Sequence, residues 1–213
     1  MGGRTYGDAC GIARALDLVG DRWALLVVRE LVLGPKRYTD LVNGLGRVAP
    51  DVLAQRLRDL EAGGLARRIV APGPGRVQVY ELTEHGQELE PVLRELGRFG
   101  SSLAMPAGEL VFSPSAAAIA LRTTFDPRRV GDLRTNCLLT LDGEPIAVGI
   151  DGGVLELRRG ARGTPEATLT TTPGVLAEVL WHGRALDDAV RAGDAEFGGD
   201  ALVLESLFDV FRR

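Results

Sequence analysis

The spacing of hydrophobic residues changes at Gly63-Gly64, and this change limits the folds open to the chain. Before it, apolar residues recur about every 3.6 residues, as they do in amphipathic helices, with glycine or proline at the breaks. After it, 65–71 and 77–83 alternate apolar and polar residues as strands do, and a Gly/Pro-rich segment, 72–76, lies between them. The sequence therefore predicts short helices followed by a β-hairpin.

Four helices are predicted before the hairpin and one after it. The five segments are 10–20, 22–34, 37–46, 49–65 and 84–103. A tight linker separates the third helix from the fourth: Gly46 suits the end of one helix, and Pro50 suits the first turn of the next. This order of helices, turn, helix, hairpin and helix is that of a winged helix-turn-helix.

The predicted helix at 49–65 has an outward face that core packing does not explain. Its inward stripe is Leu53, Leu57 and Leu60, and its outward face carries Asp51, Gln55 and Arg58. In helix-turn-helix proteins the second helix enters the major groove of double-stranded DNA. There glutamine can bind adenine, arginine can bind guanine, and aspartate can accept from cytosine or orient an arginine. A solvated helix would look similar, so the prediction of DNA binding also rests on the preceding turn and the hairpin.

Basic charge is local. The whole chain has a net charge of −4, yet 47–76 holds six arginines against three acids. This is the pattern expected when one surface binds a nucleic acid. The side chains predicted to contact phosphates are Lys36, Arg37, Arg47, Arg56 and Arg76.

The second half of the chain predicts a compact α+β domain. We place the boundary near "MPAGE", which gives domains 1–105 and 106–213. A helix at 113–127 is followed by three strands in 135–160, with Asp142-Gly143 at the first turn. A fourth strand, two short helices, a brief strand and a closing helix complete the domain.

Residues 6–103 resemble the HxlR family of winged-helix transcriptional regulators. The matching segments are Cys10, "DRW" with "RELVLGP", "RYTDL", "QRLRDLEAGGL" and "YELTEHG". The resemblance implies a homodimer on a short palindromic operator, with one recognition helix in each half-site. Ala49 departs from the Ser or Thr that often precedes this helix, which removes one helix cap. The predicted dimer stripe on the last helix is Leu89, Leu93, Leu96 and Leu103.

Residues 106–213 resemble a sterol-carrier-protein-type domain. The segments that carry the likeness are "CLLTLDGEPIAVGIDGGVLELRRG", "ATLTTTPGVLAEVLWHGRALDDAVRAGDAEFGGD" and "LFDVF". The resemblance implies a curved sheet and helices around a cavity for a lipid-like or other apolar small molecule. Residues predicted to line it are Ile146, Val148, Ile150, Trp181, Leu204 and Phe208. The alternative is that these residues are simply a filled core.

Catalysis, metal binding and membrane insertion find no support in the sequence. His85 and His182 lack metal-ligand spacing, and no nucleophile elbow or phosphate loop occurs, so we expect neither enzyme activity nor a cofactor. No signal peptide or long apolar run is seen, and two cysteines suit a reducing cytoplasm. Cys10 begins the first predicted helix, where the helix dipole favours a reactive thiolate and Asp8 opposes it, so it is a candidate thiol sensor.

Three functions remain open at this point. The first is a transcriptional regulator that responds to a ligand in its second domain. The second is a lipid carrier whose first domain serves mainly for dimerisation, and the third is a regulator whose second domain is only an interaction module. The basic cluster in 47–76 argues against the carrier, because a carrier has no use for a recognition helix and a wing.

Overall fold

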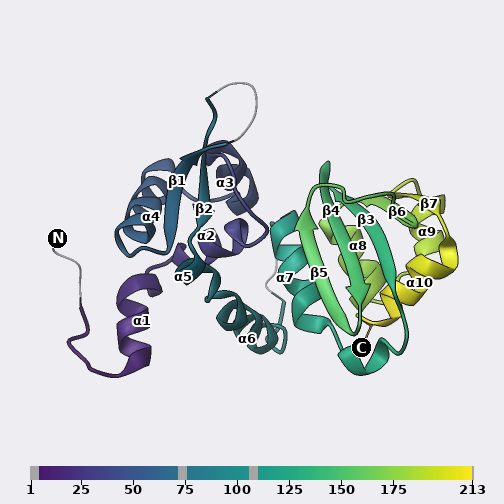
Figure 1. Cartoon of the computed structure of the whole chain (residues 1–213), viewed down its shortest axis with the longest axis horizontal. Coiled ribbons are helices and arrows are strands. Elements are labelled where there is room, and N and C mark those ends of the chain that lie inside the picture. The colour runs from purple at the N-terminus through teal and green to yellow at the C-terminus, as the bar shows by residue number, and fades with distance from the viewer. Residues whose placement is uncertain (1–4, 72–75, 106–109, 213) are drawn as a thin grey trace. The chain divides into compact units, whose positions relative to one another are not determined.

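The computed structural model describes residues 5–71, 76–105 and 110–212 (Figure 1). The chain divides into two compact units, Met1–Leu96 and Gly97–Arg213. The domain boundary that we placed between residues 105 and 106 stays a prediction. The tip of the predicted hairpin, 72–75, lies outside the described residues.

The first unit is a winged helix-turn-helix, as the sequence predicts. Its elements are α1 (Gly11–Val19), α2 (Ala24–Leu31), α3 (Tyr38–Leu45), α4 (Pro50–Ala62), β1 (Ala66–Val70), β2 (Gln78–Leu82), α5 (Glu84–Gln87) and the larger part of α6 (Glu90–Gly100), which continues past Leu96 into the second unit. The core of this unit forms where α2, α3 and α4 meet, and the three leucines of α4 that the sequence placed inward are each at most 1% exposed. Burial of this apolar surface is the main force that holds the helices together.

The predicted helix at 84–103 is two helices. Thr83 caps α5 by accepting from the Gly86 amide at 3.0 Å, and its own hydroxyl donates to the Gly64 carbonyl at 2.6 Å. A Cβ on Gly86 would lie 1.9 Å from the carbonyl oxygen of Leu65, so only glycine permits this close approach. These contacts fix the end of the wing against the turn that follows α4.

The wing is attached to the segment before α3 by backbone pairing. The Lys36 amide donates to the Tyr80 carbonyl at 2.9 Å, and the Tyr80 amide donates to the Lys36 carbonyl at 2.8 Å. Strands β1 and β2 pair antiparallel from Ala66↔Leu82 to Val70↔Gln78. The hairpin and the start of the helix-turn-helix are therefore held as one piece.

The second unit is an α+β fold built on one five-stranded sheet. Its elements are α7 (Pro114–Thr124), a 3₁₀ turn (Pro127–Arg129), β3 (Thr135–Leu141), β4 (Glu144–Asp151), β5 (Val154–Arg159), β6 (Ala167–Thr171), α8 (Pro173–Trp181), α9 (Leu186–Arg191), β7 (Ala195–Gly199) and α10 (Ala201–Asp209). The strand order is β5-β4-β3-β6-β7, with β3 and β6 parallel and the other neighbours antiparallel. Asp142 and Gly143 both have positive φ, the geometry of a tight two-residue hairpin turn.

One face of this sheet packs on helices. In the view of Figure 1, α8 and α10 lie behind the sheet. The residues of β3 alternate between buried and half-buried, and its inward side chains, Cys137, Leu139 and Leu141, are at most 1% exposed. The α+β content is confirmed, whereas the sterol-carrier-like identity of this unit stays a prediction.

Candidate nucleic-acid interface

Helix α4 begins at a fixed point on α3. The Tyr38 hydroxyl donates to the Pro50 carbonyl at 2.8 Å, and Pro50 occupies the first turn, where its missing N–H costs no hydrogen bond. No side chain caps the helix at Ala49, as the sequence predicts. Asp51 stands in the first turn, where a negative charge is favoured by the helix dipole.

The outward face of α4 carries the three side chains that the sequence singled out. Asp51, Gln55 and Arg58 are all exposed. Nη2 of Arg58 donates to Oε1 of Gln55 at 2.6 Å, and Nε2 of Gln55 donates to Oδ1 of Asp59 at 2.7 Å. A chain of hydrogen bonds therefore runs along this face and orients the Gln55 amide in the free protein.

Arg56 is held by the protein itself. Its guanidinium contacts the carboxylate of Asp21, in the turn between α1 and α2, and lies 3.2 Å from Oδ2 of Asp59. Its side chain is only 17% exposed. We predicted a phosphate contact for Arg56, but the two ion pairs instead assign it to joining α4 to the turn after α1.

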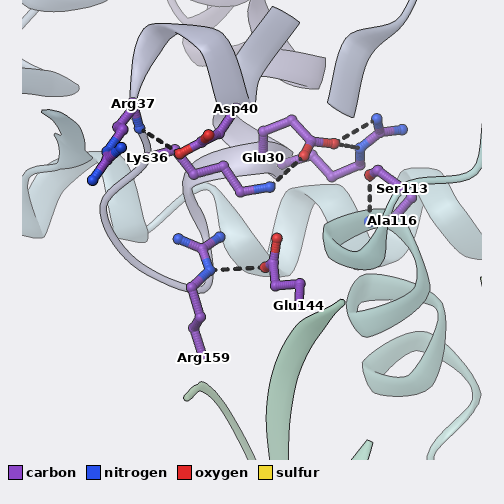
Figure 2. A network of polar contacts seen from close by, with 9 residues as sticks. Glu30, Lys36, Arg37, Asp40, Ser113, Ala116, Glu144 and Arg159 are labelled. Atoms are coloured by element: carbon purple, nitrogen blue, oxygen red, sulfur yellow. Dashed lines mark hydrogen bonds and ion pairs between the residues drawn. The ribbon is translucent and has the colours of Figure 1, made fainter. Parts of the chain in front are cut away.

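The structure contradicts the phosphate contact predicted for Lys36. It was predicted to contact a phosphate, yet its side chain is 3% exposed and its Nζ lies 2.8 Å from Oε2 of Glu30, which is fully buried (Figure 2). Arg29 donates to the other oxygen of Glu30 at 2.8 Å. A Cβ on Gly44 would lie 2.4 Å from Oε2 of Glu30, so this glycine of α3 leaves room for the carboxylate. The group is a charge network between α2 and the segment before α3, in which Glu30 and Lys36 are buried and Arg29 is 21% exposed.

The remaining predicted phosphate contacts lie on the surface. Arg37, Arg47 and Arg76 are exposed. Arg37 begins α3, where its backbone N–H donates to Asp40 at 3.0 Å (Figure 2). Arg76 follows the undescribed hairpin tip. We assigned no role to Arg68 from the sequence. It is exposed on β1 opposite Tyr80 and extends the basic surface along the wing.

The predicted dimer stripe is only partly exposed. Leu93 is 6% exposed within the core of its own unit, so its assignment to a dimer surface was wrong, whereas Leu89 packs against that core but stays partly exposed, and its place in a dimer stays a prediction. Leu96 and Leu103 are exposed as predicted, at 47% and 60%. The exposed apolar residues of the helix also include Val92 and Phe99, which the sequence reading missed.

The candidate thiol sensor, Cys10, lies on the surface. Cys10 is exposed immediately before α1, and its backbone N–H donates to Asp8 at 2.8 Å.

Residues predicted to line a ligand cavity are at most 2% exposed, except for the half-buried Trp181; the buried ones are Ile146, Val148, Ile150, Leu204 and Phe208. Among the described residues, no cluster of three histidine, cysteine or acidic side chains could hold a metal ion. No helix in the described ranges is long and apolar enough to cross a membrane.

Comparison with known proteins identifies the first unit. The profile of the HxlR-like helix-turn-helix family matches residues 18–107. The HTH-type transcriptional regulator sll1512 of Synechocystis sp. is 40% identical over 96 residues, which are 45% of this chain and 70% of that protein. The chain belongs to the HxlR-like family. It is therefore a transcriptional regulator with a DNA-binding helix-turn-helix.

Two further relatives extend the comparison. YvaP of Bacillus subtilis is 33% identical over 44% of this chain and 87% of its own length. YodB of Bacillus subtilis is 32% identical over 43% of this chain and 82% of its own. The solved reduced form of YodB has a TM-score of 0.40 at 29% identity and covers 47% of this chain and all of that one. Residues 108–213 lie outside the family match.

Proposed function

We propose that the chain is a homodimeric regulator that binds a palindromic operator in double-stranded DNA, with α4 in the major groove. The observation that carries this proposal is the outward face of α4. It presents Asp51, Gln55 and Arg58 opposite a stripe of leucines that are at most 1% exposed. The polar face is thus free to meet base edges while the apolar face anchors the helix in the core.

Recognition of the DNA bases is assigned to the three exposed side chains of α4. Arg58 has the fork geometry that pairs with guanine, and Gln55 has the amide that pairs with adenine. In the free protein these two groups bind each other, so DNA must exchange the Arg58–Gln55 hydrogen bond for bonds to bases. That exchange favours DNA only where the correct bases offer replacement partners, which is a source of specificity.

Phosphate contacts are assigned to Arg37, Arg47 and Arg76. Arg37 and Arg47 lie at the two ends of α3, and Arg76 lies on the wing. Contacts of this kind fix the register of the protein on the duplex without reading its sequence. Arg68 on the wing is added to this group because its exposed side chain lies on the same hairpin as Arg76.

The homodimer is assigned to α1 and α6. On α6 the exposed apolar side chains are Val92, Leu96, Phe99 and, just beyond the helix, Leu103. On α1, Ile12 is 72% exposed and Leu16 is 40% exposed. Apolar faces of this extent on two helices suit contact with a second copy, and two-fold symmetry would place two recognition helices one DNA turn, about 34 Å, apart.

The second unit is assigned a regulatory role through an apolar small molecule held between sheet and helices. Trp181 supports this, because its indole N–H is buried without a hydrogen-bond partner in the described structure and would suit a ligand acceptor. The alternative is an interaction module with a filled core. Native mass spectrometry of the purified full chain separates the two: a retained small molecule supports the first, and a bare protein mass supports the second.

Selection from a random DNA library tests the DNA-binding proposal without knowledge of the operator. We expect enrichment of a two-fold symmetric site with half-sites one helical turn apart. The variant Gln55→Ala should enrich a site degenerate at one base pair in each half. Enrichment of no sequence, or of the same sequence by the wild type and the variant, would contradict the assignment of α4.

A further inference from the structure

Strands β5 and β7 are the two edges of the five-stranded sheet in the second unit (Figure 1). In the part of the chain that the structure describes, no strand pairs with the outer side of β5. An edge of this kind leaves backbone N–H and C=O groups open to another strand, and natural sheets discourage such pairing with proline, bulges or repelling charges. Strand β5 has no proline, and its pairing with β4 runs without a bulge from Val154 to Arg158.

The outward backbone groups of β5 belong to its odd-numbered residues. Asp151 and Val154 close a two-residue hairpin turn, which is a hydrogen-bonded pair, so the even-numbered residues of β5 direct their N–H and C=O groups toward β4. Leu155 and Leu157 therefore direct theirs away from the sheet. The Leu157 carbonyl agrees with this, because it accepts from Nη2 of Arg122 on α7 at 3.1 Å. A carbonyl oxygen has two lone pairs, so it can accept a second bond from another strand.

The charges of β5 select one register for pairing with a copy of itself. In an antiparallel pair, outward groups meet only where odd-numbered residues face odd-numbered residues. Two such registers pair five of the six residues of β5. One is centred on Glu156 and sets this carboxylate opposite its own copy, whereas the other is centred on Leu157 and sets Glu156 of each copy opposite Arg158 of the other. Facing opposite charges stabilise a strand pair and facing like charges destabilise it, so the second register is favoured.

Both charged side chains are accessible to a second copy. Glu156 is 51% exposed and Arg158 is 66% exposed, and they alternate with Leu157, which is 3% exposed. Within the chain, Nε of Arg158 lies 3.6 Å from Oε2 of Glu156, too far for a hydrogen bond, and Arg162 binds the same oxygen at 2.9 Å. An arginine that faces Glu156 from a second copy can therefore bind Oε1, which none of the described contacts uses.

The other edge of the sheet is unsuited to a second copy. The one charged residue of β7 is Glu196, so a copy of β7 offers no opposite charge to it. The strand ends at Gly199, whose φ of 87° departs from extended backbone. Among the described strands of this sheet, β5 is therefore the edge that combines outward backbone groups with charges that match a second copy.

We propose that β5 pairs antiparallel with β5 of a second copy of this chain, in the register centred on Leu157. The two sheets then form one continuous sheet, and each strand supplies hydrogen bonds to the outward backbone groups of the other. The contact is self-complementary, as two-fold symmetry requires, because Glu156 meets Arg158 twice. One short strand from each copy makes a small interface, so we expect a Kd on the order of 0.1–1 mM. The pairing adds to the dimer that we assign to α1 and α6 and depends neither on that dimer nor on DNA binding.

Disulfide trapping in the full chain tests the register. In a Cys10→Ser background, the combination of Glu156→Cys with Arg158→Cys sets each new thiol opposite the other new thiol of the second copy, at the separation that a disulfide needs. We expect mild oxidation to give a covalent dimer that a reducing agent reverses. Either substitution alone should cross-link at least about tenfold less, because its two copies lie diagonally across the strands at about 7–8 Å, beyond the reach of a disulfide.

Charge reversal tests the same pairing without engineered thiols, through hydrogen exchange of the Leu157 amide measured by NMR. At about 0.5 mM protein, this amide should exchange about two- to fourfold more slowly in the wild type than in Glu156→Arg or in Arg158→Glu, each of which sets like charges opposite one another. The double variant, Glu156→Arg with Arg158→Glu, should return to the wild-type rate, because opposite charges face each other again.

The matched control is Arg191→Glu, which reverses a 74% exposed arginine of α9 beside β7, at the far edge of the sheet. It should leave the Leu157 amide and the cross-linking unchanged. The proposal is overturned if single and double cysteine variants cross-link equally. It is also overturned if the Leu157 amide exchanges at one rate in the wild type and both single reversals, or if the double reversal exchanges as fast as the single ones.

Discussion

Asp59 and Gln55 are joined across one turn of α4, where Nε2 of Gln55 donates to Oδ1 of Asp59 at 2.7 Å. The other oxygen of Asp59 lies 3.2 Å from Arg56, which in turn contacts Asp21 after α1. One carboxylate therefore connects the outward face of the recognition helix with the turn that follows the first helix. The turn after α1 is thus linked to Gln55 through the side chains of Arg56 and Asp59.

The first prediction follows from that carboxylate. Asp59→Ala frees the Gln55 amide to rotate, so discrimination at its base pair should fall about three- to tenfold. Affinity for random DNA should rise, since a negative charge is removed near the phosphates. Fluorescence anisotropy with the selected operator and a single-base variant measures both.

Glu61→Ala is the control. It removes an acid of the same helix that has no contact with Gln55, and it should raise random-DNA affinity but retain discrimination. Equal behaviour of the two variants would count against the positioning role.

The second prediction separates base reading from phosphate contact. Arg58→Ala should cost about 1–3 kcal/mol on the selected operator and much less on random DNA. Arg76→Ala should weaken both DNAs alike and reduce the slope of log affinity against log salt by about one. The assay is the same titration repeated at several salt concentrations. If Arg58→Ala and Arg76→Ala gave the same pattern, the assignment of roles on α4 and the wing would be wrong.

The sequence was sufficient for features set by local spacing. Helices α1 to α4 and both strands of the first unit follow from apolar periodicity, glycine breaks and Pro50, because each feature acts within a few residues. The alternation in β3 and the Asp142-Gly143 turn likewise predicted a hairpin that the structure contains. The outward face of α4 could be predicted for the same reason, since the leucine stripe fixes which side faces water.

What the sequence missed depends on contacts between distant segments. From the sequence alone, Lys36 is expected on the surface. Its burial depends on Glu30 of α2, which pairs with it, and on Gly44 of α3, which leaves room for the Glu30 carboxylate. The close approach of Gly86 in α5 to Leu65 likewise joins residues that are 21 positions apart. The parallel pairing of β3 with β6 also joins segments that are far apart in the sequence. No one-dimensional pattern carries this information.

The third prediction concerns the buried charges at Lys36. Lys36→Met leaves the fully buried Glu30 with one partner fewer, and we expect a loss of about 3 kcal/mol in the free energy of unfolding. The double variant Glu30→Met, Lys36→Met should recover part of that loss, because an apolar pair needs no compensation. Urea unfolding followed by circular dichroism measures both. A Lys36→Met variant as stable as the wild type would contradict burial of the pair, as would additive losses in the double variant.

The fourth prediction concerns thiol reactivity. Cys10 is exposed, whereas burial raises the pKa of the Cys137 thiol and keeps it in the unreactive neutral form. A thiol reagent should therefore modify one cysteine quickly in the native protein at pH 8, and that fast phase should vanish in Cys10→Ser. If Cys10 also regulates DNA binding, modification should change operator affinity in the wild type but not in Cys10→Ser. A fast reaction that persists in Cys10→Ser would show that Cys137 is accessible.

The last prediction tests the surface that we assign to the homodimer. Phe99 is 66% exposed on α6, and a charge there should not disturb a core, so Phe99→Lys should leave secondary structure intact. In a homodimer, however, two-fold symmetry places both substituted lysines in one interface, where they repel each other and lack solvent. We expect sedimentation equilibrium at micromolar concentration to show a dimer for the wild type and mostly monomer for Phe99→Lys. The operator affinity of Phe99→Lys should also fall steeply, because each monomer then contacts one half-site alone.

Leu202→Lys is the matched control: Leu202 is 78% exposed on α10, outside the proposed interface, and its substitution should leave the dimer unchanged. A wild-type monomer, or a Phe99→Lys variant that stays dimeric, would place the interface elsewhere.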